Sequence, residues 1–262
     1  MTLTETTVTY HDQGSTLIGF MAAPATIAAG TKLPAVLIIH DWKGIGDYVR
    51  ERARILARKG YVAFAVDQYG DGKHAATHEE AAALMQAYTK DSTFALNRTL
   101  AGLNQLIAHP HVDASKIVCY GYCFGGTCCL ELARHNAPVA GVAGFHAGLQ
   151  SFSGASNKNI KTRVAMFHGY NDPWISREAV QNFTKELSEA QVDFTFVDFG
   201  NTVHAFTVPG INNPPAMIYN ESSDKQSWAY FEFWLHHITL GGAKSGAPDC
   251  CNKGDAGAAS CH

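Results

Sequence analysis

A regular alternation between short apolar runs and longer amphipathic stretches constrains the fold of this chain most. Residues 33–39 read LPAVLII, and such continuous apolar runs are typical of strands that are covered on both faces. Residues 46–59 then place apolar side chains at helical spacing, and Gly60 follows as a stop. Because this order recurs along the chain, we expect an α/β fold with a mainly parallel central sheet and helices on both faces.

The other expected elements continue this order. Strands are predicted at 61–66, 116–120, 139–145, 164–167 and 194–199, and helices at 79–88, 94–108, 124–135, 176–190 and 222–238. Residues 6–10 and 16–22 flank a turn around Gly14 and predict an antiparallel hairpin at the sheet edge. We therefore expect a single domain over residues 1–240. Residues 241–262 are rich in Gly and Ala, lack apolar periodicity and predict a flexible tail.

Composition and cysteine usage narrow the class of protein. Hydrophobic residues make up 46% of the 262, which excludes a disordered chain, and the formal net charge of −3 argues against a nucleic-acid binder. No apolar run approaches the ~20 residues of a membrane helix, and the N-terminus does not resemble a secretory signal. The seven cysteines are odd in number, and four of them lie between Cys119 and Cys129. We therefore expect reduced thiols in a cytoplasmic protein that binds neither nucleic acid nor membrane.

The most informative segment joins a predicted strand to a predicted helix. It reads Gly121-Tyr122-Cys123-Phe124-Gly125, which is the nucleophile-elbow pattern G-x-S-x-G with Cys in the place of Ser. The turn is so sharp that its flanking positions cannot carry large side chains, and it lifts the Cys123 sulfur above the carboxyl edge of the sheet. The helix dipole at that position favours a thiolate. Cys123 is the predicted nucleophile.

A nucleophile of this kind needs a base, and the base needs an orienting acid. In α/β-hydrolases the chain order is nucleophile, acid, base. Asp172 follows the strand predicted at 164–167, and His204 follows the strand predicted at 194–199. Because both loops leave the same edge of the sheet, we expect Asp172 and His204 to complete a triad with Cys123.

The predicted chemistry also needs two backbone N–H groups as an oxyanion hole. Phe124, directly after the nucleophile, supplies one, and Trp42, in the loop after an early strand, supplies the other. His40 in the same loop is an alternative base, although it lies outside the usual chain order. The bulky residues expected around an apolar pocket are Trp42, Tyr69, Trp174 and Phe206.

These motifs resemble the dienelactone hydrolase family of α/β-hydrolases over roughly residues 15–240. The resemblance is carried by Ile38-Ile-His-Asp-Trp42, Ala65-Val-Asp-Gln-Tyr69, Gly121-Tyr-Cys-Phe-Gly-Gly126, His168-Gly-Tyr-Asn-Asp-Pro173 and Val203-His-Ala-Phe206. It implies a Cys-Asp-His triad at Cys123, Asp172 and His204 that hydrolyses enol-lactones to keto acids without a metal or organic cofactor. The expected partner is a small ester or lactone, and the expected state is a monomer or homodimer.

The sequence departs from the family at the residue that pairs with the resting Cys and His and at the residues that bind the substrate carboxylate. Family members have a Glu that pairs with the resting Cys and His, and the matching residue here is Asp41, one methylene shorter. They also bind the substrate carboxylate with arginines, but residues 205–208 and 59–97 contain none. We therefore predict a preference for neutral esters and lactones, with Lys43 and Arg177 as the cations that could reach the pocket.

Two other functions remain open from the sequence. A thiol redox enzyme would use Cys123 as an oxidisable thiolate with a neighbouring resolving Cys, but no C-x-x-C lies in a redox-type setting. A non-catalytic α/β-hydrolase scaffold would bind ligand only, and such proteins typically lose a triad residue. His236 and His237 with the tail cysteines match no zinc motif, so we expect no metal. Cys128 and Cys129 are expected in the core.

Overall fold

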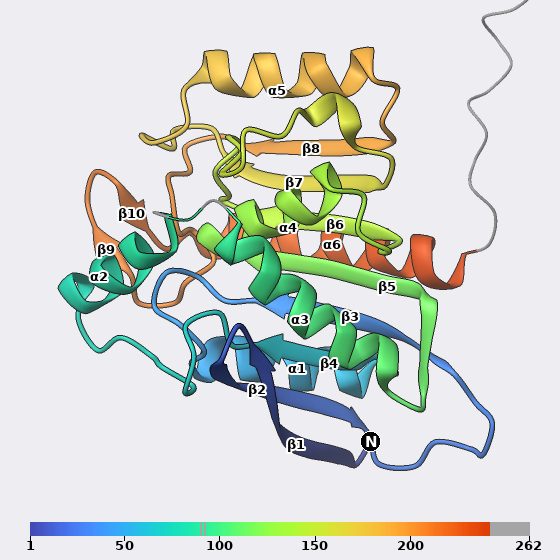
Figure 1. The fold of residues 1–262 in the computed structure, drawn as a ribbon. Coiled ribbons are helices and arrows are strands. Elements are labelled where there is room, and N and C mark those ends of the chain that lie inside the picture. Colours follow the sequence, from blue (N-terminus) through green and yellow to red (C-terminus); the bar gives the residue numbers. More distant parts are fainter. Residues whose placement is uncertain (90, 92, 242–262) are drawn as a thin grey trace, which may run out of the picture.

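The computed structural model describes residues 1–89, 91 and 93–241. At its centre lies an eight-stranded sheet with the order β1-β2-β4-β3-β5-β6-β7-β8 (Figure 1). The strands are β1 (Leu3–Asp12), β2 (Ser15–Pro24), β3 (Leu33–Ile39), β4 (Val62–Val66), β5 (Val112–Tyr122), β6 (Gly141–Phe145), β7 (Arg163–Gly169) and β8 (Phe194–Phe199). Every neighbouring pair from β4 to β8 runs parallel, whereas β2 pairs antiparallel with both β1 and β4. The predicted mainly parallel sheet is confirmed.

Helices cover both faces of the sheet (Figure 1). They are α1 (Asp47–Arg58), α2 (His78–Thr89), α3 (Phe94–Ala108), α4 (Phe124–Arg134), α5 (Arg177–Glu189) and α6 (Glu221–Leu240). One core layer includes residues of α3, α4 and α5, and the other includes residues of α1 and α6. Neighbouring residues of β3 divide between the layers, Leu37 in the first and Ile38 in the second. Burial on both faces is why the strands read as continuous apolar runs.

The N-terminal hairpin forms as predicted but is longer. β1 and β2 pair from Leu3 with Pro24 to Asp12 with Ser15. The two residues between them, Gln13 and Gly14, have φ angles of 45° and 79°, which suits a two-residue turn joining twisted antiparallel strands.

A second, two-stranded sheet was not predicted. It consists of β9 (Asn212–Asn213) and β10 (Met217–Ile218), and strands of two residues are too short to show an alternating pattern. The loop after β8 holds it in place, because the His204 N–H donates to the Ala216 carbonyl at 3.2 Å and the Ile218 N–H donates to the His204 carbonyl at 3.3 Å.

Several sequence expectations concern membranes, metals and the tail. Within the described residues, no helix is both long and apolar enough to cross a membrane. The same part of the chain holds no group of three His, Cys, Asp or Glu side chains placed to bind a metal ion. Of the tail predicted over residues 241–262, only Gly241 belongs to the described residues. Cys250, Cys251, Cys261 and His262 lie outside them.

Candidate active site

Cys123 lies on a strained turn between β5 and α4. Its backbone angles are φ 51° and ψ −117°, which cost energy for a residue with a Cβ. A Cβ on Gly121 would collide with the backbone of Gly125. A Cβ on Gly125 would in turn collide with the backbone at the end of β3. These close approaches explain why glycine stands on both sides of this turn.

His204 and Asp172 form a buried hydrogen-bonded pair. Nδ1 of His204 lies 2.7 Å from Oδ2 of Asp172, and the two side chains are 5% and 0% exposed. The Trp174 N–H donates to the other oxygen, Oδ1, at 3.0 Å. Asp172 follows β7 and His204 follows β8, so the sheet places both at its carboxyl edge. The carboxylate thereby fixes the orientation of the imidazole.

The electrostatics favour a protonated His204. Burial opposes a charge on the ring, but the negative charge of a Cys123 thiolate and the hydrogen bond to Asp172 outweigh it and raise the pKa of His204 to about 10. A side-chain hydrogen bond with Cys123 adds to the rise in the pKa of His204. Nε2, the second ring nitrogen, is buried with no other hydrogen-bond partner among the described residues, so it is the nitrogen placed for proton transfer.

Cys123 and His204 line the same cavity, which has a volume of about 380 Å³. Its other lining residues are Asp41, Trp42, Lys43, His78, Met85, His146, Trp174, Ala205, Val208, Ile211, Asn213 and Met217. Asp172 does not line it, because it lies on the far side of the imidazole. The fold thus places the predicted nucleophile and base at one mostly apolar cavity, with the predicted acid behind the base.

A comparison with protein families identifies the family of this chain. The model of the dienelactone hydrolase family matches residues 19–239. The chain belongs to the dienelactone hydrolase family. The resemblance inferred from the motifs is therefore confirmed, and the chain is an ester or lactone hydrolase.

Several individual proteins are similar to this chain. An uncharacterised Caenorhabditis elegans protein is 33% identical over 142 residues, which are 52% of this chain and 89% of that protein. A Bradyrhizobium protein named "probable 2-oxo-3-(5-oxofuran-2-ylidene)propanoate lactonase" is 28% identical over 202 residues, 74% of this chain and 80% of its own. The crystal structure of a dienelactone hydrolase-like promiscuous phosphotriesterase from metagenomic libraries has a TM-score of 0.83 and 31% identity, covering 90% of this chain and 98% of that one. An acylaminoacyl peptidase, 15% identical with a TM-score of 0.73 over 95% of this chain and 43% of its own, shares the fold alone, and the predicted α/β-hydrolase fold is confirmed.

Of the two residues expected to form the oxyanion hole, Phe124 directly follows the predicted nucleophile and Trp42 lines the same cavity. Phe124 is the first residue of α4, so its N–H has no acceptor within the helix. Trp42 lines the cavity, and its carbonyl accepts a hydrogen bond from the Tyr69 hydroxyl at 2.8 Å. Asp41 steadies the same turn by accepting the Lys43 N–H at 2.8 Å. Asp41 also lines the cavity to which Cys123 contributes.

His40 has a structural role, and the alternative of His40 as the base is wrong. The Gln68 N–H donates to its Nε2 at 3.2 Å, so Nε2 is the acceptor nitrogen. The other nitrogen, Nδ1, must then carry the proton and donate it to the Asp41 carbonyl at 2.6 Å. Burial lowers the pKa of His40. With both nitrogens engaged and the ring fully buried, His40 cannot take a proton from a nucleophile.

Only part of the expected aromatic pocket lines the cavity. Trp174 does, and it is 56% exposed. Tyr69 and Phe206 do not, which corrects the expectation for them: the Tyr69 hydroxyl is bound to the Trp42 carbonyl, and Phe206 is 0% exposed and packs against Phe199 in the core. The sequence does not reveal which way each ring points.

His146 was not predicted from the sequence. It follows β6, lines the cavity and packs edge-on against His204, with ring centroids 4.9 Å apart. Its φ of 41° is strained for a non-glycine residue, and its Nε2 lies 2.9 Å from Thr207 Oγ1. Burial lowers the pKa of His146 well below its ordinary value, so the ring is neutral and does not repel an imidazolium at His204. The sequence signal that could have identified His146 as a site residue is its position directly after a predicted strand.

The cations differ in their access to the cavity. Arg177 does not line it, because its guanidinium binds both oxygens of Asp198 at 3.1 and 2.6 Å and stacks on Tyr170. Lys43 does line it, together with the carboxylate of Asp41. Among the described residues, no arginine contributes to the cavity wall.

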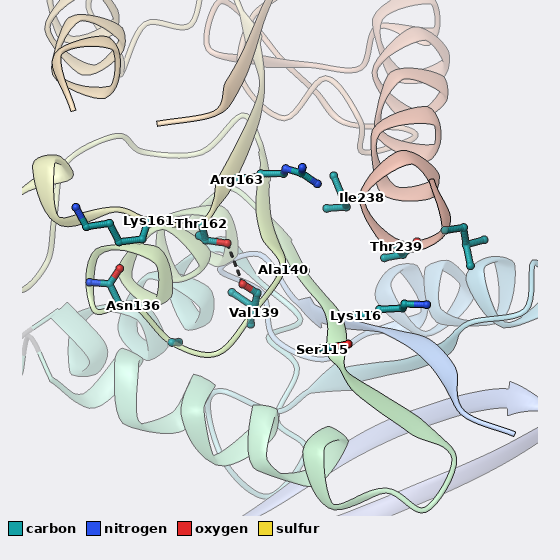
Figure 2. A pocket seen from close by; sticks show the side chains of 12 residues that line it. Ser115, Lys116, Asn136, Val139, Ala140, Lys161, Thr162, Arg163, Ile238 and Thr239 are labelled. Carbon is teal, nitrogen blue, oxygen red and sulfur yellow. Dashed lines mark hydrogen bonds between the residues drawn. The ribbon is translucent and has the colours of Figure 1, made fainter. Parts of the chain in front are cut away.

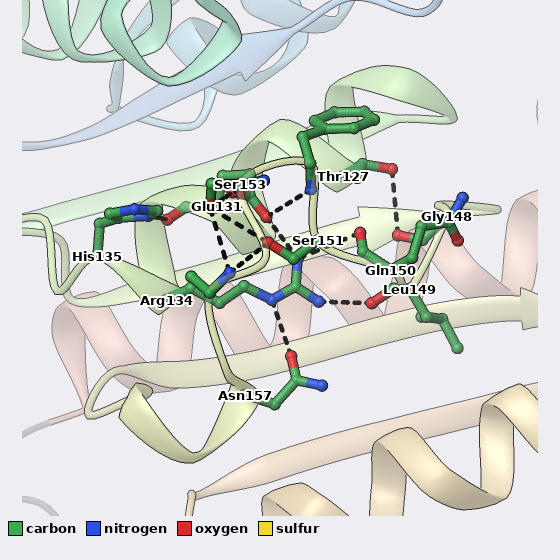
Figure 3. Close-up of polar contacts among 12 residues, drawn as sticks. Thr127, Glu131, Arg134, His135, Gly148, Leu149, Gln150, Ser151, Ser153 and Asn157 are labelled. Carbon is green, nitrogen blue, oxygen red and sulfur yellow. Dashed lines mark hydrogen bonds and ion pairs between the residues drawn. The ribbon is translucent and has the colours of Figure 1, made fainter. Parts of the chain in front are cut away.

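A buried ion pair fixes the loop that begins at His146 (Figure 3). Glu131 and Arg134 of α4 lie 2.8 Å apart, and each side chain is 1% exposed. Arg134 donates to the Leu149 carbonyl, and Glu131 accepts the Ser153 hydroxyl at 2.6 Å. The network therefore anchors the loop after β6 to α4, the helix that begins directly after Cys123.

A larger cavity of about 560 Å³ lies at the opposite, amino edge of the sheet (Figure 2). Its cations are partly paired, with Lys116 3.7 Å from Asp113 and Arg163 2.9 Å from Asp193. It contains no predicted site residue, so the smaller cavity is the candidate active site.

Proposed function

We propose that this chain hydrolyses carboxylic esters or lactones through a Cys123-His204-Asp172 triad and a covalent acyl-enzyme. The observation that carries the proposal is the meeting of Cys123 and His204 at one cavity, with Asp172 bound to the far nitrogen of His204. The lactonase name of the Bradyrhizobium relative is consistent with this substrate class. No metal or organic cofactor is required for these steps.

In the first half-reaction, the Cys123 thiolate attacks the carbonyl carbon of the substrate. The carbonyl electron pair moves to oxygen, and the N–H groups of Trp42 and Phe124 stabilise the resulting oxyanion. As the tetrahedral species collapses, the bond to the leaving oxygen breaks and His204 gives that oxygen its proton. The products are a thioester on Cys123 and a neutral imidazole.

Loss of the thiolate charge prepares His204 for the second half-reaction. The thiolate is a main cause of the raised pKa of His204, so thioester formation removes that cause and lets the proton leave. Neutral His204 then takes a proton from water, and the hydroxide attacks the thioester. The acid is released, and the thiolate and imidazolium form again.

A generic aryl ester tests the proposal. Purified full-length chain should hydrolyse p-nitrophenyl acetate well above the buffer rate and should lose this activity after alkylation by iodoacetamide. A chain that binds such an ester without turning it over would be a scaffold, and turnover that survives complete alkylation of Cys123 would exclude a cysteine mechanism.

The ionisation of His204 should depend on the thiol. We expect the His204 ring to titrate near pH 10 in the wild type and at clearly lower pH in Cys123→Ser, because the hydroxyl is neutral where the thiolate was charged. Nitrogen NMR of labelled histidine measures both midpoints. His40 serves as the internal control, because burial lowers its pKa and neither Cys123 nor His204 contributes to that shift. Equal His204 midpoints in the two proteins would refute a resting ion pair.

Substrate charge should affect catalysis. With mostly apolar walls and no arginine among the described lining residues, a substrate carboxylate would be buried without a strong partner. We therefore expect kcat/KM for a lactone methyl ester to exceed that for the free acid by about tenfold or more. Kinetics with both compounds, repeated in Lys43→Met, provide the test. A preference for the free acid that disappears in Lys43→Met would identify Lys43 as a carboxylate clamp and contradict the prediction.

A further inference from the structure

His146 combines a strained backbone with a tightly held place in the wall of the candidate active site. Its φ of 41° lies in the left-handed region, which costs energy for a residue with a Cβ and persists only where the surroundings enforce it. Its N–H donates to the Phe167 carbonyl at 2.8 Å. Two residues further on, the Gly148 carbonyl accepts the Thr127 hydroxyl of α4 at 3.1 Å (Figure 3). Strained residues gather at functional sites, and His146 lines the cavity of this one.

The side chain of His146 is fixed as firmly as its backbone. The ring is 1% exposed, and its Nε2 lies 2.9 Å from Oγ1 of Thr207, which is also 1% exposed. Thr207 is held from α1, because the Tyr48 hydroxyl donates to its carbonyl at 2.9 Å. Arg52 in turn donates to the Tyr48 hydroxyl at 3.1 Å and to Asp224 of α6 at 3.3 Å. The hydrogen bond to Thr207 therefore ties the His146 ring to a segment that α1 and α6 keep in place.

Two aromatic rings support the orientation that Asp172 gives to His204. The hydrogen bond between these two side chains, 2.7 Å long, acts at one ring atom, Nδ1, and alone would allow the ring to tilt about that atom. His146 and Trp174 restrict the tilt, because both pack edge-on against His204 with ring centroids 4.9 and 4.5 Å away. Trp174 is 56% exposed, whereas His146 is buried and tethered. His146 is therefore the firmer of the two restraints.

We propose that His146, tied to Thr207, is a positioning residue that keeps Nε2 of His204 directed toward the nucleophile. This role rests on the cysteine mechanism proposed above. A misdirected Nε2 would slow proton transfer to the leaving oxygen and from water, so both half-reactions depend on the restraint. Burial and the nearby His204 lower the pKa of His146 well below its ordinary value. The His146 ring is therefore neutral and packs against the imidazolium without charge repulsion.

Removal of the Thr207 hydroxyl tests the tether. Thr207→Val resembles Thr in shape but cannot bind His146, and we expect it to lower kcat for p-nitrophenyl acetate by at least about tenfold with little change in KM. Thr207→Ser restores a hydroxyl and should keep kcat close to that of the wild type. Steady-state kinetics of the full chain give both constants. Wild-type kcat in Thr207→Val would overturn the proposal, and so would a raised KM with unchanged kcat, which is the effect of a lost substrate contact.

Thr202→Val is the matched control for lost stability. Thr202 is also 1% exposed and lies in the same loop after β8, but its hydroxyl contacts Ser223 Oγ at 2.8 Å and the Gly200 carbonyl at 3.0 Å. We expect this variant to have a lower unfolding temperature, as Thr207→Val has, and a kcat near that of the wild type. Equal losses of kcat in the two variants would assign the effect to a general loosening of the loop and would overturn the proposal.

A double-mutant cycle tests whether His146 and Thr207 act as one unit. His146→Phe keeps a ring beside His204 but lacks the nitrogen that binds Thr207, so kcat should fall to about the level of Thr207→Val. The double variant should show no further loss, because both changes remove the same hydrogen bond. Losses that multiply would overturn the proposal. Activity that persists in Cys123→Ala would refute the mechanism and this proposal with it, whereas an inactive Cys123→Ala beside a fully active Thr207→Val would refute the positioning role alone.

Discussion

Replacing Cys123 with Ala is expected to lower kcat for ester hydrolysis by at least about 10⁴-fold, because the variant has no atom that can form the acyl bond. Cys123→Ser should retain only a small fraction of activity, since a thiol loses its proton far more readily than a hydroxyl. The measurement is the steady-state hydrolysis of an aryl ester, with thermal unfolding to show that the variants fold.

Cys128→Ala provides the matched control for the nucleophile. Cys128 lies on the same helix, α4, but is fully buried, and burial raises its pKa well above the ordinary value, so it stays a neutral thiol. We expect its activity to remain near that of the wild type. Near wild-type turnover in Cys123→Ala would disprove the proposed mechanism.

Asp172→Asn is expected to lower kcat by about 10⁴-fold, the size found when the acid of a comparable triad is made neutral. The carboxylate accepts a hydrogen bond from His204 at 2.7 Å and stabilises the imidazolium, but it does not reach the cavity. KM should therefore change little. Steady-state kinetics separate the two constants.

Asp198→Asn is the control for Asp172. Asp198 also lies near the carboxyl edge, but its carboxylate pairs with Arg177 at the surface, and we expect kcat to stay close to that of the wild type. If Asp172→Asn instead raised KM and preserved kcat, Asp172 would be a substrate-binding residue.

The parts of the structure that could be predicted are those with a strict local cause. Because β3 is buried on both faces, its sequence is a continuous apolar run. The close backbone contacts at Gly121 and Gly125 demand glycine, so the elbow is visible as a motif. The parallel sheet brings strand ends to one edge, which is why Asp172 and His204 could be placed together.

The rest of the site depends on tertiary contacts that leave little trace in the sequence. The β9–β10 segment contributes Asn213 and Met217 to the cavity wall, but its strands are too short to show a period. The direction in which a side chain points is also not visible in the sequence. Tyr69 and Phe206 were both expected at the pocket, yet the Tyr69 hydroxyl binds the Trp42 carbonyl and Phe206 lies in the core.

The central claim, that Cys123 carries the acyl group, can be tested most directly by mass spectrometry. Enzyme mixed with an aryl ester and quenched in acid within the first turnovers should gain the mass of one acyl group, and peptide mapping should locate it on Cys123. The pre-steady-state release of the aryl alcohol should match the acylated fraction. Steady turnover with no acyl group on Cys123 at any quench time, and with full activity in Cys123→Ala, would contradict the account.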